Sequence, residues 1–102
     1  MDVVQVSIPE AQLADFCRRN GIRKLALFGS VLTGRFSAAS DIDILVEFHP
    51  HQRIGFFRLA DMELELSRML GGQKVDLRTA MDLSRHFSDD VVRDARVVYA
   101  EP

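Results

Sequence analysis

The chain has 102 residues, with 13 Lys and Arg side chains against 15 Asp and Glu, and a formal net charge of -2. It is too short for two ordinary domains and too balanced in charge for a basic nucleic-acid binder. A hydrophobic content of 47% is also too high for a disordered tail. We therefore expect one globular domain over residues 1–102, built around a single hydrophobic core.

Cysteine content and hydropathy indicate the compartment. Cys17 is the single cysteine, so no internal disulfide can form, and nothing points to an oxidising environment. No apolar run approaches the roughly 20 residues that cross a bilayer, and the first residues contain no basic segment. The sequence predicts a cytoplasmic protein that makes no membrane contact.

The first half of the chain predicts one helix and two strands. Ser7 to Glu10 has the form of a capping box, and the apolar spacing after it predicts a helix from about Ile8 to Asn20. The apolar run Lys24–Phe28 lacks helical periodicity and predicts a buried strand. The segment Asp41–Phe48 alternates with period two, which predicts a second strand with one apolar and one polar face.

The second half predicts two more helices and two more strands. The apolar stripe over about Gly55 to Leu70 predicts a helix, and Lys74–Arg78 alternates as a strand does. A further helix is expected from about Ala80 to Asp94, and Val97–Tyr99 reads as an edge strand. This order predicts an α/β (α+β) fold, a small mixed sheet with helices packed on it. The directions of the strands do not follow from the pattern.

Two acids on the second strand are chemically unusual. Aspartate is disfavoured in strands, yet Asp41 and Asp43 occupy alternate positions on one face, about 6.6 Å apart along the backbone. Two carboxylates this close repel each other unless a cation lies between them, and oxygen ligands are those that Mg²⁺ prefers. The alternative is a solvent-facing pair at the edge of the sheet.

A glycine and a serine follow the first strand. At Gly29 the backbone can approach a ligand closely, and the Ser30 hydroxyl with the N–H groups of a following helical turn can hold a phosphate. The alternative is a plain turn in which Ser30 caps the helix. No Gly-Lys-Ser/Thr sequence follows, so this is not a Walker A loop.

A third acid, Asp76, lies within the short apolar alternation of the third strand, on the face opposite Val75 and Leu77. If this strand lies beside the second one with matching faces, Asp76 joins Asp41 and Asp43. The three carboxylates would then form a ligand set for two divalent ions. The alternative is one exposed acid offset by Lys74 and Arg78.

Taken together, these segments resemble a known family. Leu27-Phe28-Gly29-Ser30, Gly34, Ser40 to Phe48 and Lys74-Val75-Asp76-Leu77 look like the minimal nucleotidyltransferase domain of the DNA polymerase beta superfamily. The likeness runs from about Gly21 to Tyr99, and Gly-Ser, ten residues, then Asp-x-Asp is its specific pattern. It implies a polymerase-beta-like nucleotidyltransferase core.

The resemblance also implies roles for these residues. Gly29 and Ser30 would hold the triphosphate of a nucleotide, usually ATP, and Asp41 and Asp43 would coordinate two Mg²⁺ ions. Asp76 would share the metal nearer the acceptor and help to deprotonate an incoming hydroxyl. The chain departs from the family at one position, because Thr33 stands where members commonly have arginine.

Small proteins of this family are typically the antitoxin of a pair whose toxin is a HEPN-domain ribonuclease. The resemblance implies that the acceptor is a tyrosine hydroxyl on that toxin, which is adenylylated and silenced. With 102 residues we expect no acceptor-binding domain in the chain itself, and the charge of -2 argues against a nucleic-acid acceptor. Both a homo-oligomer and a complex with the toxin are compatible with the composition.

Other functions stay open. The same fold could neutralise a toxin by binding alone, or transfer a nucleotide to a small molecule or an RNA end. The helix over Gly55–Leu70 offers a possible docking surface at Phe57, Ala60 and Leu64, although we favour burial of this second apolar patch in a small domain.

Overall fold

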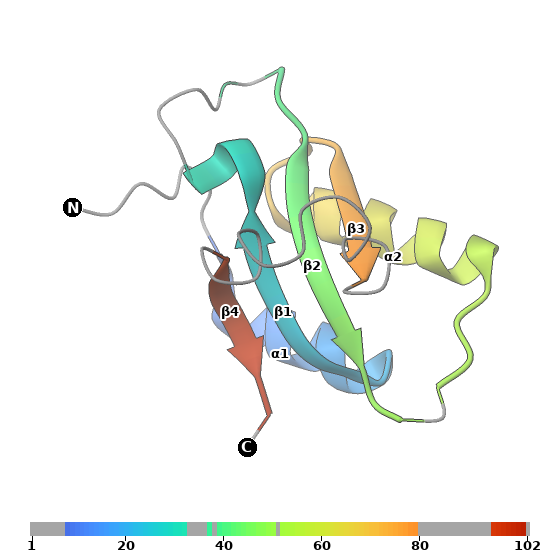
Figure 1. Cartoon of the computed structure of the whole chain (residues 1–102). Helices are drawn as coiled ribbons and strands as arrows, with labels where there is room; N and C mark the ends of the chain where they lie inside the picture. The colour runs from blue at the N-terminus through green and yellow to red at the C-terminus, as the bar shows by residue number, and fades with distance from the viewer. Residues whose placement is uncertain (1–7, 33–36, 38, 51, 80–94, 102) are drawn as a thin grey trace.

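The computed structural model of the chain describes residues 8–32, 37, 39–50, 52–79 and 95–101. Two α-helices, one 3-10 turn and four strands follow one another along it (Figure 1). Their bounds are α1 Glu10–Arg19, β1 Ile22–Phe28, η1 Gly29–Leu32, β2 Ile42–Phe48, α2 Phe56–Met69, β3 Val75–Thr79 and β4 Arg96–Ala100. The helix predicted over about Ala80 to Asp94 lies outside the described residues.

The four strands form one mixed sheet in the order β3-β2-β1-β4. Strand β1 runs antiparallel to both of its neighbours, whereas β2 and β3 are parallel. The crossover between the parallel strands is α2, as a parallel pair requires. The predicted fold class, a small mixed sheet with helices packed on it, is therefore confirmed.

Both α-helices cover the same face of the sheet, behind it in the view of Figure 1. Helix α1 contributes Leu13, Phe16 and Cys17 to the core, and α2 contributes Met62 and Leu66. They pack on the apolar side chains of the strands, which are Ile22, Leu25, Leu27, Ile42, Ile44, Val46, Val75 and Leu77. The period-two pattern leaves the alternate side chains of β2 and β3 on the opposite face.

The first helix begins later than the sequence predicted. Its first residue is Glu10, its N-cap is Pro9 with no side-chain hydrogen bond, and Leu13 N–H donates to the Pro9 oxygen at 2.9 Å. The predicted start at Ile8 is wrong because a residue before proline is disfavoured in the helical region. The capping box fails for the same reason, since it would need Glu10 two positions further into the helix.

The other element bounds differ from the predicted ones by one or two residues. Helix α1 ends where Gly21 takes a left-handed φ of 67°, which a glycine adopts without steric cost. None of the described helices is long and apolar enough to span a membrane.

Candidate functional site

Three structural segments meet at the end of the sheet where β1 stops and β2 and β3 begin. Gly29 follows the last residue of β1 and has a φ of 78°. A Cβ added at this glycine would overlap the Oδ2 atom of Asp43. The bend after β1 therefore rests directly against the Asp43 carboxylate, which explains why this position holds a glycine. Ser30 lies in η1, which buried Val31 anchors in the core.

The register of the parallel strands brings two of the predicted acids together. Asp43 of β2 pairs with Asp76 of β3, and across the antiparallel pair Asp43 lies opposite Phe28. Paired residues on neighbouring strands point to the same face. Both carboxylates thus lie on the face of the sheet that the two α-helices leave uncovered, as expected if the strands were neighbours with matching faces.

Asp41 completes the group, because it lies just before β2 and also acts on Asp43. Burial raises the pKa of Asp43 above its ordinary value, and the negative charges of Asp76 and Asp41 raise it further, while Arg78 opposes them. A carboxyl whose pKa is raised by like charges is typical of a functional site. The three acids therefore share one electrostatic environment.

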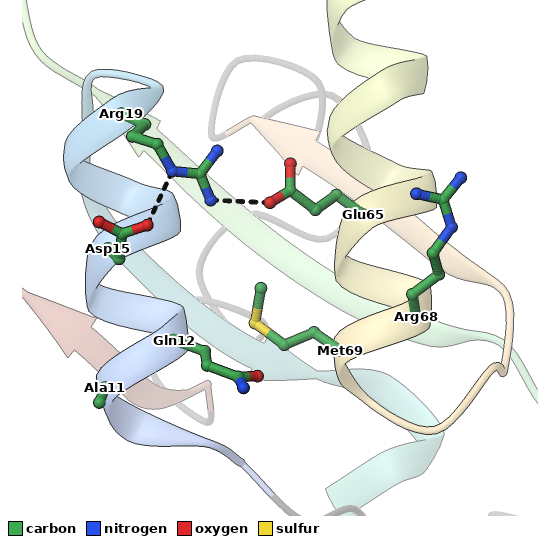
Figure 2. Close-up of a pocket in the computed structure, with 7 residues that line it drawn as sticks. All are labelled: Ala11, Gln12, Asp15, Arg19, Glu65, Arg68 and Met69. Atoms are coloured by element: carbon green, nitrogen blue, oxygen red, sulfur yellow. Dashed lines mark hydrogen bonds and ion pairs between the residues drawn. The ribbon is translucent and has the colours of Figure 1, made fainter.

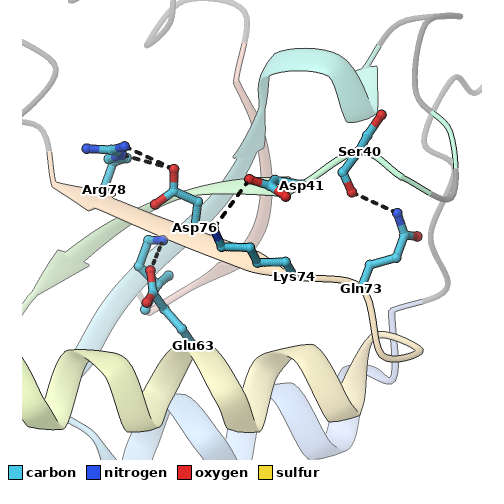
Figure 3. Close-up of polar contacts among 8 residues, drawn as sticks. Ser40, Asp41, Glu63, Gln73, Lys74, Asp76 and Arg78 are labelled. Atoms are coloured by element: carbon cyan, nitrogen blue, oxygen red, sulfur yellow. Dashed lines mark hydrogen bonds and ion pairs between the residues drawn. The ribbon is translucent and has the colours of Figure 1, made fainter.

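Asp41 and Asp76, the two neighbours of Asp43 in the cluster, each face a positively charged side chain (Figure 3). The guanidinium of Arg78 lies 3.1 Å from Asp76 Oδ2, and Lys74 Nζ lies 4.0 Å from Asp41 Oδ2. In these side-chain conformations, no three His, Cys, Asp or Glu groups among the described residues form a set that could hold a metal ion. The donor chemistry nevertheless fits Mg²⁺, because all three side chains offer carboxylate oxygens.

Hydrogen bonds to backbone oxygens hold the segment before β2 against the start of β3. The side chain of Gln73 donates to the backbone oxygens of Ser37 and Ser40, at 3.0 Å each. Lys74, the residue after Gln73, accepts a further hydrogen bond of 2.8 Å at its backbone oxygen from Ile42 N–H. These bonds fix the approach of Asp41 to β3 (Figure 3). Sequence reasoning missed Gln73, because an amide that binds backbone oxygens leaves no pattern.

Glu63 of α2 is a second residue that the sequence did not reveal. Its Oε2 accepts a hydrogen bond of 2.8 Å from Leu77 N–H, next to Asp76 (Figure 3). Strand β3 is an outer strand among the strands that the structure describes, so within these strands this N–H has no backbone acceptor on that side. Glu63 thereby ties the strand that carries Asp76 to the helix below it.

Glu63→Ala should lower the free energy of unfolding by about 1–2 kcal/mol, because a half-buried N–H loses its charged acceptor. Thermal or urea unfolding measures the loss. Glu63→Gln keeps an acceptor and should recover part of it. Glu65→Ala on the same helix removes an exposed ion pair with Arg19 and should have a much smaller effect, because solvent screens that pair. Equal losses for Glu63→Ala and Glu65→Ala would show that the bond to β3 contributes nothing.

A hollow between α1 and α2 lies away from the acids, on the helical side of the sheet (Figure 2). Arg19 spans it, binding Asp15 at 2.8 Å and Glu65 at 2.7 Å. None of the predicted site residues lines this hollow. The acids lie instead on the opposite face of the sheet, which neither α1 nor α2 covers.

The second apolar patch of α2 is exposed, contrary to the burial that we favoured. Phe57 is 83% exposed and Leu64 57%, while Ala60 between them is partly buried. Phe56 is also exposed and packs edge-on against Phe57, with ring centroids 6.0 Å apart. The prediction of burial is wrong because α2 packs on the core with its other apolar face, the one that carries Met62 and Leu66. This leaves aromatic surface available to a partner.

Thr33, the position at which the sequence departs from the family it resembles, lies outside the described residues. Among the described residues, the positive charge near the acids comes from Lys74, just before β3, and from Arg78 within β3.

Comparison with known proteins defines the class to which this fold and site belong. The family model for the nucleotidyltransferase domain matches residues 10–99, which include the bend at Gly29 and all three acids. The chain therefore belongs to the nucleotidyltransferase domain family.

Individual proteins of known name or structure are also similar to this chain. The chain is 32% identical over 93 residues to the protein adenylyltransferase MntA of Thermococcus cleftensis, covering 91% of this chain and 89% of the relative. A solved minimal nucleotidyltransferase is 29% identical with a TM-score of 0.67, covering 84% of this chain and 85% of the other. A toxin–antitoxin structure with AMP-PNP shares the fold, with a TM-score of 0.71 at 22% identity, covering 92% and 75% of the two chains.

Proposed function

We propose that this chain is a cytoplasmic, Mg²⁺-dependent nucleotidyltransferase that moves AMP from ATP to a hydroxyl group on a partner protein, a HEPN-domain ribonuclease toxin. The observation that carries the proposal is the meeting of Gly29, Asp43 and Asp76 at one end of the sheet. A bend without a side chain and a cluster of carboxylates are what a triphosphate with its counter-ions requires.

In this proposal each residue has a distinct task. The bend at Gly29 and Ser30 receives the triphosphate, because Gly29 has no side chain and its backbone lies directly beside the Asp43 carboxylate. Asp41, Asp43 and Asp76 would hold the divalent ions, and Asp76 would also face the acceptor. When bound, Mg²⁺ supplies positive charge that offsets the phosphates and the leaving pyrophosphate. Asp76 orients the acceptor hydroxyl and takes its proton as the oxygen bonds to the α-phosphorus and pyrophosphate departs.

Two observations support a protein as the acceptor. The relative from Thermococcus cleftensis, which this chain matches over 89% of its length, is a protein adenylyltransferase. The exposed aromatic patch of Phe56, Phe57 and Leu64 suits a protein surface better than a nucleic acid. A toxin as the partner is proposed from the family resemblance, and the chain shares its fold with a protein of a toxin–antitoxin complex.

The proposal is tested by incubating the protein with Mg²⁺, α-labelled ATP and the product of the neighbouring gene. We expect label on the neighbour, placed on a hydroxyl side chain by mass spectrometry, and none with γ-labelled ATP. Asp43→Asn should abolish the label. Label that appears without Mg²⁺, or that persists in Asp43→Asn, would contradict the proposed mechanism.

A second candidate is a binding module that neutralises the toxin by complex formation alone. The exposed patch on α2 supports complex formation, and in the described residues no three His, Cys, Asp or Glu groups are arranged to hold a metal ion. The two are separated in cells that express the toxin. Neutralisation by Asp43→Asn equal to that by the natural protein, with no label on the toxin, would favour binding alone.

A further inference from the structure

Two cations flank the third acid in the sequence, Lys74 just before β3 and Arg78 within it. Asp76 and Arg78 occupy alternate positions of β3, so they point to one face, the face of Asp43. Lys74 lies 4.0 Å from Asp41. Arg78 donates from both Nε and Nη2 to Asp76 Oδ2, at 3.2 and 3.1 Å (Figure 3). Two charge-assisted bonds to a single oxygen occupy the lone pairs with which that atom would bind a metal.

The pairing is local and reversible. Asp76 and Arg78 are neighbours on one strand, and the Arg78 side chain is 51% exposed, so it can turn into solvent without moving the backbone. Arg78 also acts at a distance, because its charge lowers the pKa of Asp43 against the effect of Asp76 and Asp41. Its guanidinium therefore offsets the negative charge of the whole acid cluster.

We propose that Arg78 is a positioning residue that acts as a counter-ion for Asp76 and competes with divalent cations for it. With no cation bound, Arg78 holds the Asp76 carboxylate and limits its repulsion with Asp43. Beside a bound divalent ion the Arg78 guanidinium would be repelled, and the Asp76 oxygen that it releases would be free to act as a ligand. Arg78 thus sets the cation concentration at which the site fills. This inference rests on the proposed role of Asp76 as a metal ligand.

The inference is tested by Mn²⁺ binding to the full chain without nucleotide, measured by calorimetry or by the electron paramagnetic resonance of free Mn²⁺. Arg78→Gln should tighten binding roughly two- to fivefold, the range expected for loss of a partly exposed ion pair. Arg78→Lys keeps the charge but not the paired donors, and should give an intermediate affinity. The far-ultraviolet circular dichroism of each variant verifies that it is folded.

Lys74→Gln is the matched control, because it removes the same charge beside the same acid cluster. The Lys74 side chain is 78% exposed and its Nζ lies 4.0 Å from Asp41 Oδ2, so we expect a change below about twofold. Equal tightening by Lys74→Gln and Arg78→Gln would reduce the effect to net charge and overturn the inference. Weaker binding by Arg78→Gln would overturn it as well, because Arg78 would then help the site to form.

Asp76→Asn separates the inference from the proposed function. If it weakens Mn²⁺ binding while Arg78→Gln has no effect, only the competition is wrong. If it leaves Mn²⁺ binding unchanged, Asp76 is not a metal ligand, and the proposed role of Asp76 fails together with the inference.

Discussion

Replacing Asp43 by asparagine is expected to abolish nucleotidyl transfer and, at the same time, to raise the melting temperature of the protein. If Asp43 holds a divalent ion as proposed, its loss should cost several kcal/mol of transition-state stabilisation, a rate decrease of about 10³-fold or more. The gain in stability follows from the raised pKa of Asp43, which means that the charged carboxylate is disfavoured in the folded chain. Asparagine removes that charge.

The direction of the change in stability follows from proton binding by Asp43. A carboxyl whose pKa is higher in the folded than in the unfolded chain contributes stability below its ordinary pKa, and this contribution is lost as the pH rises through the folded value. At neutral pH the natural protein has lost this stabilising contribution because Asp43 is charged, whereas the uncharged asparagine of Asp43→Asn keeps it. We expect a melting temperature higher by roughly 2–6 °C, since about 1 kcal/mol corresponds to 4–8 °C in a domain of this size. The difference should shrink as the pH is lowered towards 4.

Glu47→Gln is the control on the same strand. Glu47 is exposed and pairs with Arg23, so its neutralisation should neither raise the melting temperature nor affect transfer. A lower melting temperature for Asp43→Asn at pH 7.5, or transfer at an unchanged rate, would be incompatible with the electrostatic account of the acid cluster.

The second large effect is expected at Gly29. Gly29→Ala combines a left-handed φ of 78°, which costs a residue with a Cβ about 1 kcal/mol or more, with overlap of the Asp43 carboxylate. We expect a loss of about 2–3 kcal/mol in the free energy of unfolding, because the carboxylate must move. Transfer should be lost with it, since Asp43 then leaves the cluster. Urea unfolding and the labelling assay measure the two effects.

Gly71→Ala is the matched control, because Gly71 has a φ of 103° but nothing within 4 Å of an added Cβ. It should show the backbone cost alone and keep transfer. Adding Gly29→Ala to Asp43→Ala should also cost less than adding it to the natural chain, since the overlapping carboxylate is gone. If Gly29→Ala costs the same in both backgrounds, the contact between the bend and Asp43 has no energetic role.

The sequence predicted those parts of the fold that depend on local pattern. The alternation through Ile42 to Phe48 specified a strand, and its polar face correctly carried Asp43. That Asp76 lies beside it could only be stated conditionally, because strand order and direction depend on contacts between distant segments. The assignment of metal ligands and catalytic roles stays a prediction.

Three features escaped the sequence for different physical reasons. The start of α1 was misplaced because the restriction that Pro9 imposes on its predecessor outweighed the capping pattern. The exposure of Phe57 was missed because helical spacing marks two apolar stripes without saying which one meets the sheet. Glu63 was missed because its partner is a backbone N–H, which every residue but proline offers.

The position of Asp76 on an outer strand has a consequence for heat tolerance. Strand β3 is five residues long and is hydrogen-bonded on one side to β2, while Glu63 holds an N–H on its other side. Short peripheral segments of this kind detach at a lower energetic cost than the centre of a domain. Warming should therefore silence catalysis while the remaining strands are still intact, so that inactivation precedes global melting.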